Sequence, residues 1–471
     1  MLESKEPKKA NLGQALFVIV FLIAVLFVSL VLMGADPHVP LIIATIAAGL
    51  IGIVSLGFKW SDLEEAMIQS ISMAMQAVLI LMVIGSVIGT WILSGTVPSM
   101  IYYGLQILSP GIFLVATAII CSVVSISTGS SWTTAGTVGI ALLGVGIGLG
   151  IPIGMVAGAI VSGAYFGDKL SPLSDTTNLA PAMAGATLFD HIRSMIWTTI
   201  PAFIISIILY GILGSRYAGQ ELNAEEINMM LSAIGDNFMI SPMLFIPPIV
   251  VIIIVIKKVP ALPGLLSGVI LGGIFAAIFQ GASLGDVIEA AHYGFSMDSG
   301  YEVVDSLLSR GGLDGMMWTI SLILIALCFG GILEKTGMLH AIGDFILRFA
   351  KGTGSLVAAT VLTCFAVNFL AGEQYIALVI PGRMYRDTYK EKGIHPKILS
   401  RALEGGGTIT SALIPWNTCG VFMWGTLGVH PFVYAPYAFL NLITPIVNIV
   451  YGFTGWTIEK CDDNEEATEV E

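Results

Sequence analysis

The sequence predicts an all-α polytopic membrane protein with about 10–12 transmembrane segments. Apolar runs recur along the chain, and their lengths are close to the roughly 20 residues that one spanning helix needs. Of its 471 residues, 56% are hydrophobic and only 11% are charged, whereas soluble domains carry about 25% charged residues. The mean hydropathy is +0.90. This composition excludes a soluble enzyme, a nucleic-acid-binding protein and a disordered chain.

The apolar runs predict where the spanning helices lie. They fall at 14–33, 39–57, 72–94, 112–127, 192–214, 242–257, 261–279, 316–334, 355–371 and 432–454. The regions 128–182 and 372–428 are equally apolar but are interrupted by Gly, Ser, Thr and Pro. Irregular backbone at membrane depth is tolerated only where protein or a water-filled cavity satisfies its polar groups. We therefore expect broken helices or re-entrant hairpins in both regions.

The remaining segments are polar. The segments 215–241 and 280–315 are expected to form loops with short amphipathic helices. The tail at 459–471 is acidic, which is typical of a disordered terminus.

The chain contains an internal repeat. Residues 111–172 align without gaps with 354–415, at an offset of 243 residues, and matches include Gly129 with Gly372. A fixed offset over such a length indicates two copies of one structural unit. The second copy carries an insertion near 290–312.

Basic residues fall on opposite ends of corresponding helices in the two copies. The positive-inside rule predicts this pattern for two repeats of inverted orientation. Lys8 and Lys9 precede the first span and place the N-terminus in the cytoplasm. By the same rule Lys257 and Lys258 are assigned to the cytoplasmic side.

The repeat divides the chain into two halves. The first half, 1–235, consists of spans at 14–110 and of a hairpin with a broken helix at 111–190. The second half, 236–458, consists of spans at 242–350 and of a hairpin with a broken helix at 354–430. Inverted repeats with broken helices are typical of secondary transporters, whose substrate site lies near the bilayer midplane.

Hydroxyl groups are concentrated at the first predicted break, in the run from Ser127 to Thr137. Hydroxyls and freed backbone carbonyls are hard oxygen ligands that suit Na⁺, although small hydroxyl residues are also typical of closely packed helices. The candidate binding residues here are Ser127, Thr128, Ser130, Ser131 and Thr133.

Charges inside apolar stretches form the second group of candidates, because an intramembrane charge costs about 2.5 to 3.5 kcal/mol on the insertion scale. Asp168 and Asp175 lie in such a stretch. Asp175 can hold Na⁺ when ionised and a proton when neutral, and this competition is the simplest chemistry of ion exchange. Asp168 can alternatively form a structural ion pair with Lys169. The oxygen-rich turn adds Ser174, Thr176, Thr177 and Asn178 as candidates.

The second copy supplies counterparts of these groups. Glu373 occupies the place of Ser130, and Asn417 and Thr418 follow a proline much as Asp175 and Thr176 do, one residue apart in register. The sequence predicts Na⁺ near Asp175, Thr176, Asn417 and Thr418.

Arg401 and Glu404 lie three residues apart and share one helical face. This spacing indicates either a structural ion pair or two functional groups. In the second case Glu404 is a further proton site and Arg401 grips an organic carboxylate.

Several signals point away from other classes of protein. No P-loop occurs, so ATP does not drive this chain directly. The run from Gly281 to Gly285 matches the spacing of a hydrolase nucleophile elbow but lacks its strand–turn–helix setting. We expect neither an enzyme nor a bound cofactor.

Long stretches of the chain resemble the NhaC family of bacterial Na⁺/H⁺ antiporters. The resemblance rests on STGSSWTTAGTVGIAL, GAIVSGAYFGDKLSPLSDTTNLAPAMAG, ADPHVPL, GTVPSMIYYG and EQYIALVIPGRMY, and it covers nearly the whole chain. It implies a scaffold domain, mainly 14–110 and 242–350, and a moving transport domain made of the hairpins and broken helices at 111–190 and 354–430. It also implies, often, a homodimer, and a multi-pass protein of the bacterial cytoplasmic (inner) membrane. Some NhaC-like proteins exchange malate and lactate together with Na⁺ and H⁺, and others carry amino acids.

More distantly, the chain is similar to the wider ion-transporter superfamily. Its dicarboxylate carriers place a Ser-Asn-Thr motif at the tip of each of two hairpins. This chain departs from that motif with Ser174-Asp175-Thr176 and Trp416-Asn417-Thr418. An Asp in place of the Asn adds a titratable group, which suits proton exchange.

The leading hypothesis is therefore Na⁺/H⁺ antiport by alternating access, with Na⁺, H⁺ and the lipid bilayer as partners and no nucleic acid. The alternative is a Na⁺- and H⁺-coupled organic acid exchanger, such as a malate/lactate antiporter, or an amino-acid carrier. An ion channel is a third class, which the inverted repeat disfavours.

Overall fold

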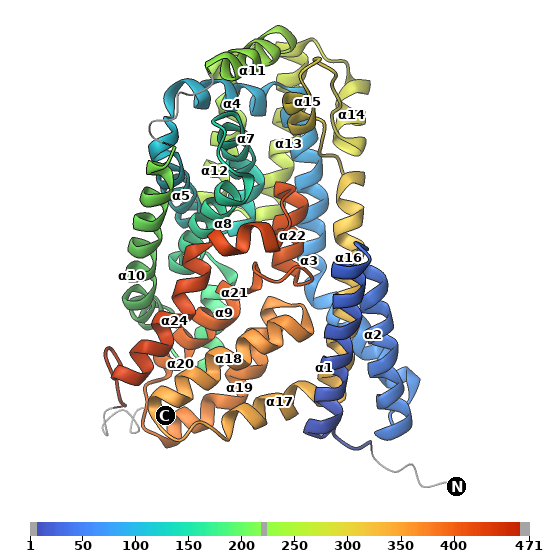
Figure 1. Cartoon of the computed structure of the whole chain (residues 1–471), viewed down its shortest axis with the longest axis vertical. Helices are drawn as coiled ribbons and strands as arrows, with labels where there is room; N and C mark the ends of the chain where they lie inside the picture. Colours follow the sequence, from blue (N-terminus) through green and yellow to red (C-terminus); the bar gives the residue numbers. More distant parts are fainter. Residues whose placement is uncertain (1–6, 218–223, 462–471) are drawn as a thin grey trace.

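The computed structural model describes residues 7–217 and 224–461, and apart from one β-bridge between Ile394 and Lys460 its regular elements there are helices (Figure 1). Within these residues nine helices are long and apolar enough to cross a membrane, or up to eleven if each of two bent helix pairs counts as one span. The predicted all-α polytopic class is confirmed. Most of the acidic tail lies outside the described residues.

The first part of the chain forms long helices: α1 (Leu12–Leu26, continued by a π-helix to Leu32), α2 (His38–Leu50), α3 (Trp60–Leu93) and α4 (Thr96–Ile107). The predicted span at 72–94 marks only the apolar part of α3, which begins twelve residues earlier. Its polar first turn is capped, since Asp62 accepts a hydrogen bond from the Lys59 backbone N–H at 3.1 Å. Hydropathy therefore located the membrane-facing length and missed the helix start.

The first interrupted region forms the predicted hairpin and broken helix. It comprises α5 (Pro110–Thr128), α6 (Ser131–Thr134), a π-helix η3 (Ala135–Gly139), α7 (Ile140–Gly148), α8 (Ile153–Leu170), α9 (Asp175–Ala184) and α10 (Leu188–Ser215). The chain turns between α5 and α6 at Gly129, whose φ of 68° is favourable only for glycine.

The second part begins with α11 (Ala224–Asn237), which lies across one end of the molecule (Figure 1) and is bent by 91° from the helix pair that follows it. Next come a 3₁₀ turn η4 (Pro242–Phe245), α12 (Ile246–Ile256), α13 (Ala261–Gln280), α14 (Leu284–Tyr293), α15 (Glu302–Leu308), a 3₁₀ turn η5 (Asp314–Met316), α16 (Met317–Lys335) and α17 (Met338–Leu347). The insertion separates α14 from α16, so one long helix of the first copy corresponds to two here.

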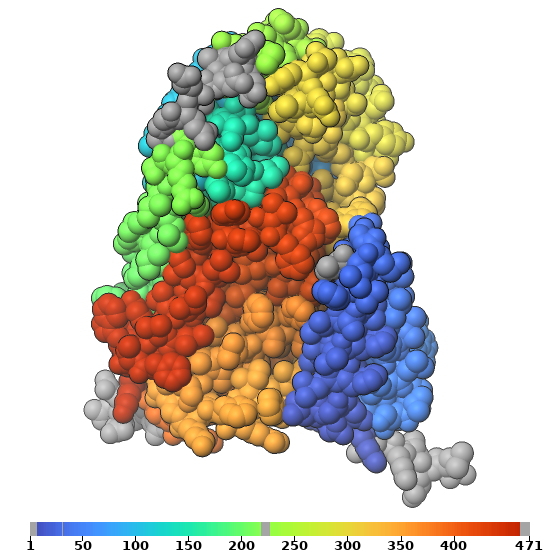
Figure 2. Space-filling model, in the orientation of Figure 1, coloured from blue at the N-terminus to red at the C-terminus, as the bar shows by residue number. Residues whose placement is uncertain are grey.

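The second interrupted region closes the chain. It comprises α18 (Thr353–Ala371), α19 (Gln374–Glu391), α20 (Pro396–Leu403), a π-helix η6 (Glu404–Thr408), α21 (Ile409–Ser411), α22 (Thr418–Leu427), α23 (Pro431–Tyr434), a 3₁₀ turn η7 (Ala435–Tyr437) and α24 (Phe439–Thr454). In Figure 2 the surface of α22 to α24, in red, crosses the front of the molecule between its yellow-green and its orange and blue parts.

The two copies match element by element at the offset of 243. Both α5 and α18 end at a left-handed glycine, and α8 and α20 begin at matching positions. The caps of α9 and α22 follow the same offset, because Ser174 pairs with Asn417 and Asp175 with Thr418, so the counterpart of Asp175 is Thr418 and not Asn417. In Figure 1, α4, which precedes α5, and α17, which precedes α18, lie near opposite ends, so the hairpins enter from opposite ends.

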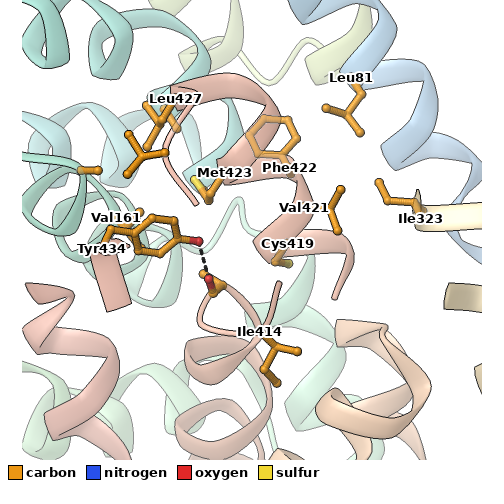
Figure 3. Close-up of a cluster of buried hydrophobic side chains, with 14 of the residues drawn as sticks. Leu81, Val161, Ile323, Ile414, Cys419, Val421, Phe422, Met423, Leu427 and Tyr434 are labelled. Atoms are coloured by element: carbon orange, nitrogen blue, oxygen red, sulfur yellow. Dashed lines mark hydrogen bonds between the residues drawn. The ribbon is translucent and has the colours of Figure 1, made fainter. Parts of the chain in front are cut away.

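Apolar side chains from both copies fill the space between these hairpins. Figure 3 shows Val421, Phe422 and Met423 of α22 between Leu81 of α3 and Val161 of α8. The hydroxyl group of buried Tyr434 donates a hydrogen bond to the Ala412 carbonyl in the same cluster. This core holds the ends of the broken helices in place beside the site.

Candidate functional site

A cavity of about 310 Å³ lies where the two hairpins meet, and we call it the central cavity. Its walls are the first tip (residues 128–132), the second tip (residues 373–375), the ends of α8, α9 and α22, the middle of α3, and the turn between α12 and α13. Of the predicted site residues, the cavity brings together Thr128, Ser130, Ser131, Asp168, Asp175, Glu373 and Thr418.

The two tips have the same local structure. After the left-handed glycine, Ser130 caps α6 and its hydroxyl accepts a hydrogen bond from the Thr133 N–H at 3.1 Å. Glu373 caps α19 in the same way, since its Oε1 accepts from the Tyr375 N–H at 3.1 Å. The side chain of Glu373 is only 2% exposed, and its Oε2 has no hydrogen-bond partner within the described residues. Glu373 thus combines a place in the cavity wall with one buried oxygen that no described donor satisfies.

Asp168 faces the first tip from the end of α8. Its Oδ2 accepts hydrogen bonds from the Ser131 hydroxyl at 2.6 Å and from the Ser131 N–H at 3.3 Å. Its Oδ1 has no partner in the part of the chain that the structure describes, although the residue is 6% exposed. A buried carboxylate oxygen without a donor is costly unless a cation or a proton satisfies it.

The equivalent contact occurs in the second copy with other chemistry. There the hydroxyl of Ser411, at the position of Asp168, donates to Oε1 of Gln374, at the position of Ser131, over 2.9 Å. Gln374 Oε1 also lies 2.7 Å from the Cys419 thiol. Each tip is thus attached to its own broken helix by one polar contact.

Asp175 connects the two copies directly. It is the first residue of α9, and its Oδ2 accepts a hydrogen bond from the Tyr375 hydroxyl of the second tip. Asp175 is exposed to the cavity, and the α9 N-terminus on which it lies favours its negative charge. Separating the second tip from α9 would therefore break a charge-assisted hydrogen bond.

Several predicted residues hold the backbone instead of lining the cavity. Ser174 caps α9, and the Thr177 hydroxyl donates to the carbonyls of Asp168 and Lys169 at 3.1 and 3.2 Å. Asn178 donates to the Ser174 carbonyl at 2.6 Å. The other predicted residues outside the cavity wall are Ser127, Thr133, Thr176 and Asn417. Of these, Asn417 caps α22 by accepting from the Cys419 N–H at 3.0 Å.

Arg401 and Glu404 also lie away from the cavity wall. The Arg401 guanidinium donates to the Thr457 hydroxyl at 2.9 Å. Among the described residues the single salt bridge joins Lys397 and Glu459 at 2.6 Å, so neither the Arg401–Glu404 pair nor an Asp168–Lys169 pair is formed. The guanidinium does not reach a ligand in the central cavity.

Sequence reasoning missed four polar residues of the cavity wall: Gln76, Gln374, Tyr375 and Lys258. The first three carry no charge, so the cost of burying a charge gave no signal for them. Lys258, which the positive-inside rule assigns to the cytoplasmic side, lines the same cavity as Gln76 and Ile80, halfway along α3. Its φ of 63° is uncommon for a residue with a side chain, which is the kind of strain found at functional sites.

The cavity is acidic overall, because Asp168, Asp175 and Glu373 face one lysine. Within the described residues no group of three or more His, Cys, Asp or Glu residues could hold a metal ion by itself. A hard monovalent cation in this cavity would therefore take its oxygens from both carboxylates and hydroxyl groups.

The chain matches known proteins over most of its length. The model of the Na⁺/H⁺ antiporter family matches residues 163–456. The Na⁺/H⁺ antiporter NhaC of Alkalihalophilus pseudofirmus is 40% identical, over 96% of this chain and 98% of that protein. The malate-2H⁺/Na⁺-lactate antiporter of Bacillus subtilis is 38% identical, over 96% of each chain. The arginine/ornithine antiporter ArcD of Halobacterium salinarum is 38% identical, over 98% of this chain and 96% of that one.

The fold and the cavity define a multi-pass membrane transport protein, with two broken-helix hairpins around an acidic site. The chain belongs to the Na⁺/H⁺ antiporter family, and its relatives include NhaC and the malate/lactate antiporter. The matched members reported above are antiporters.

Proposed function

We propose that this protein exchanges Na⁺ for H⁺ across the bacterial inner membrane by alternating access, with the N-terminus in the cytoplasm and without a cofactor. The observation that carries the proposal is that two acids of the cavity wall, Asp168 and Glu373, each keep one buried carboxylate oxygen, Oδ1 and Oε2 respectively, without a hydrogen-bond partner among the described residues. A cation and a proton are the two ligands that satisfy such oxygens, and they exclude each other.

In this mechanism Na⁺ binds when the cavity acids are ionised. The hydroxyl groups of Ser130, Ser131 and Thr418 add neutral oxygens around the ion. Protonation of the carboxylates removes the charge that holds Na⁺ and releases it. Because one carboxylate cannot hold both ions, transport of one requires departure of the other, which is the condition for exchange without leak.

Alternating access requires the cavity to open toward each side in turn. We assign α5 to α9 and α18 to α22 to a moving transport domain, and α1 to α3 and α12 to α16 to a scaffold that also supports a homodimer. The bond between Tyr375 and Asp175 keeps the parts of the transport domain together, because it joins the two copies across the cavity.

Proteoliposomes loaded with a pH-sensitive dye test the proposal. An inward Na⁺ gradient should drive H⁺ out, and Glu373→Gln should lower the apparent Na⁺ affinity at least about 10-fold, since it removes a charge at a buried site. The control Glu334→Gln removes a half-buried acid of α16 that lies outside the cavity wall, and it should leave exchange unchanged. Na⁺-driven H⁺ movement that is equal in Glu373→Gln and in the wild type would disprove the assignment.

A second candidate, Na⁺- and H⁺-coupled exchange of a small organic acid such as malate or lactate, is favoured by the cavity volume and by Lys258. A volume of about 310 Å³ exceeds the need of one Na⁺ ion, and water occupies about 30 Å³ per molecule in the liquid. Lys258 supplies a cation that can pair with an organic carboxylate. The sequence-based choice for this role, Arg401, lies outside the cavity wall.

Labelled malate uptake distinguishes the two candidates. Lys258→Asn removes the charge and keeps a residue that tolerates positive φ, and the neighbouring Lys257→Asn is the matched control because Lys257 is not part of the cavity wall. Ion-dependent malate uptake that is lost only in Lys258→Asn supports organic acid exchange. Absence of uptake while Na⁺/H⁺ exchange proceeds excludes it. The same panel with labelled arginine tests the amino-acid carrier.

A further inference from the structure

A second cluster of buried ionisable groups lies beside the central cavity but outside its wall. Lys169 at the end of α8, Glu404 at the start of the π-helix η6, and His191 of α10 are each 0% exposed. Three separate elements thus bring a lysine, a carboxylate and an imidazole into one interior region. The mechanism proposed above uses none of them.

These groups lack ordinary partners. Among the described residues, the Lys169 ammonium, both carboxylate oxygens of Glu404 and Nε2 of His191 make no hydrogen bond. Lys169 and Glu404 are each other's principal opposite charge, yet they form no salt bridge within 4.0 Å. A buried charge without a close partner costs several kcal/mol. If Lys169 and Glu404 served only as a structural ion pair, we would expect their charged groups to lie in direct contact.

A proton transfer removes that cost. If one proton moves from the Lys169 ammonium to the Glu404 carboxylate, the products are a neutral amine and a neutral carboxylic acid, and no atom or charge is left over. The pair can therefore gain or lose a single proton without leaving two uncompensated charges. Glu404 also begins a π-helix, and such irregular turns occur frequently at functional sites.

The pair is connected to the central cavity on one side. Lys169 directly follows Asp168, and the Thr177 hydroxyl bridges the carbonyls of both residues. Glu404 is close enough to Asp168 and Asp175 for their charges to interact. A change in the charge of these cavity acids therefore changes the electrostatic potential at Glu404.

On the other side the cluster leads toward the end of the molecule that carries α17 and α20 (Figure 1). His191 Nδ1 and the Ser400 hydroxyl are 2.8 Å apart, and that hydroxyl donates to the Lys397 carbonyl at 2.9 Å. Lys397 forms its salt bridge with Glu459 near this end. The titratable and charged groups that face the pair are Asp168 on α8, Asp175 on α9, His191 on α10, Cys364 on α18 and Arg401 on α20.

We propose that Lys169 and Glu404 form a proton relay between the carboxylates of the central cavity and the face of the protein at which α20 begins. The relay moves protons and does not bind Na⁺. This inference rests on the proposed Na⁺/H⁺ exchange and adds the route by which the proton arrives.

The test distinguishes two roles of Lys169: a side chain that supplies only a fixed positive charge, and one that releases and takes up a proton. Lys169→Arg keeps the positive charge, but a guanidinium does not release its proton in a protein. We expect this variant to exchange Na⁺ for H⁺ about 100-fold more slowly, within the range that a positioned proton donor contributes. Lys392→Arg is the matched control, because Lys392 is exposed near the same end and outside the cluster, and its rate should equal that of the wild type.

Na⁺ binding by the purified protein, measured as Na⁺-dependent thermal stabilisation, provides the independent readout. Lys169→Arg and Glu404→Gln should bind Na⁺ within about threefold of the wild type, since the relay lies outside the site, whereas Glu373→Gln should not. Loss of Na⁺ binding in Glu373→Gln with unimpaired exchange in Lys169→Arg would refute the relay and leave the proposed function intact. Unchanged binding in Glu373→Gln would refute the proposed function.

A double variant tests the relay even if the single variants fail to fold. Lys169→Met with Glu404→Gln leaves no lone charge in the interior, so a purely structural pair would be replaced without harm. We expect the double variant to fold and to bind Na⁺, but to exchange as slowly as Lys169→Arg. Exchange within about twofold of the wild type in the double variant would overturn the relay.

Discussion

The first and second tips have the same backbone and different chemistry. Each follows a left-handed glycine and each begins with a capping residue, but that residue is Ser130 in one copy and Glu373 in the other. On the broken helices the acid belongs to the first copy instead, since Asp168 of the first copy corresponds to Ser411 of the second. Each copy thus contributes, from a different element, one buried acid with an oxygen that has no partner among the described residues, and a duplicated fold produces an asymmetric site.

The largest expected effect comes from removing the polar group at equivalent positions of the two broken helices, Asp168 in the first copy and Ser411 in the second. Asp168→Asn removes a buried charge that faces the cavity and should slow Na⁺/H⁺ exchange at least about 100-fold, from a loss of roughly 3–5 kcal/mol. The equivalent Ser411→Ala removes hydrogen bonds of a neutral group and should slow exchange only about fivefold. Initial rates in proteoliposomes measure both, and equal losses would show that the two positions share one role.

A smaller effect is expected at the aromatic residue of each tip. Tyr375→Phe removes the hydroxyl that donates to Asp175 and should lower the exchange rate about 10-fold, because a hydrogen bond to a charged group is worth roughly 1.5–3 kcal/mol. At the equivalent position Trp132 stacks on Phe422 with ring centroids 3.9 Å apart. Trp132→Phe keeps an aromatic ring there and should change the rate less than about twofold. A greater loss in Trp132→Phe than in Tyr375→Phe would contradict the role of the Asp175 bond.

The smallest effects concern the glycines that reverse the chain. Gly129→Ala and Gly372→Ala both place a side chain at a positive φ, which costs about 1–2 kcal/mol. An added Cβ would lie 2.6 Å from Leu173 Cβ at Gly129, but 3.1 Å from the nearest atom, the Trp416 carbonyl oxygen, at Gly372. Gly129→Ala should therefore lower the midpoint of thermal unfolding more than Gly372→Ala, and the reverse order would contradict these contacts.

The sequence predicted the class of fold and the interrupted regions because burial of apolar helices and the need to satisfy broken backbone are strong physical constraints. Three acids that the sequence singled out, Asp168, Asp175 and Glu373, line the central cavity, and they were conspicuous because a charge at membrane depth is costly. Sequence reasoning could not find Tyr375 or Gln374, because burying an uncharged polar side chain costs less free energy than burying a charge and therefore leaves no signal in the sequence.

The sequence also contained no sign that Lys258 belongs to the cavity wall. The positive-inside rule counts charges along the chain, so it does not show that Lys258 lines the same cavity as the middle of α3. Asn417 is likened to Asp175 by residue type, one residue out of register, whereas the offset of 243 that aligns Pro172 with Pro415 pairs Asn417 with Ser174, and both of these residues are helix caps.

The hydrogen bond between Tyr375 and Asp175 joins residues that are 200 positions apart. At a synthesis rate of about 5–20 residues per second, the ribosome needs roughly 10–40 s to make the intervening chain. During that interval Asp175 has already been made, whereas its donor Tyr375 has not. The contact between the two copies can therefore form only after most of the chain has been synthesised.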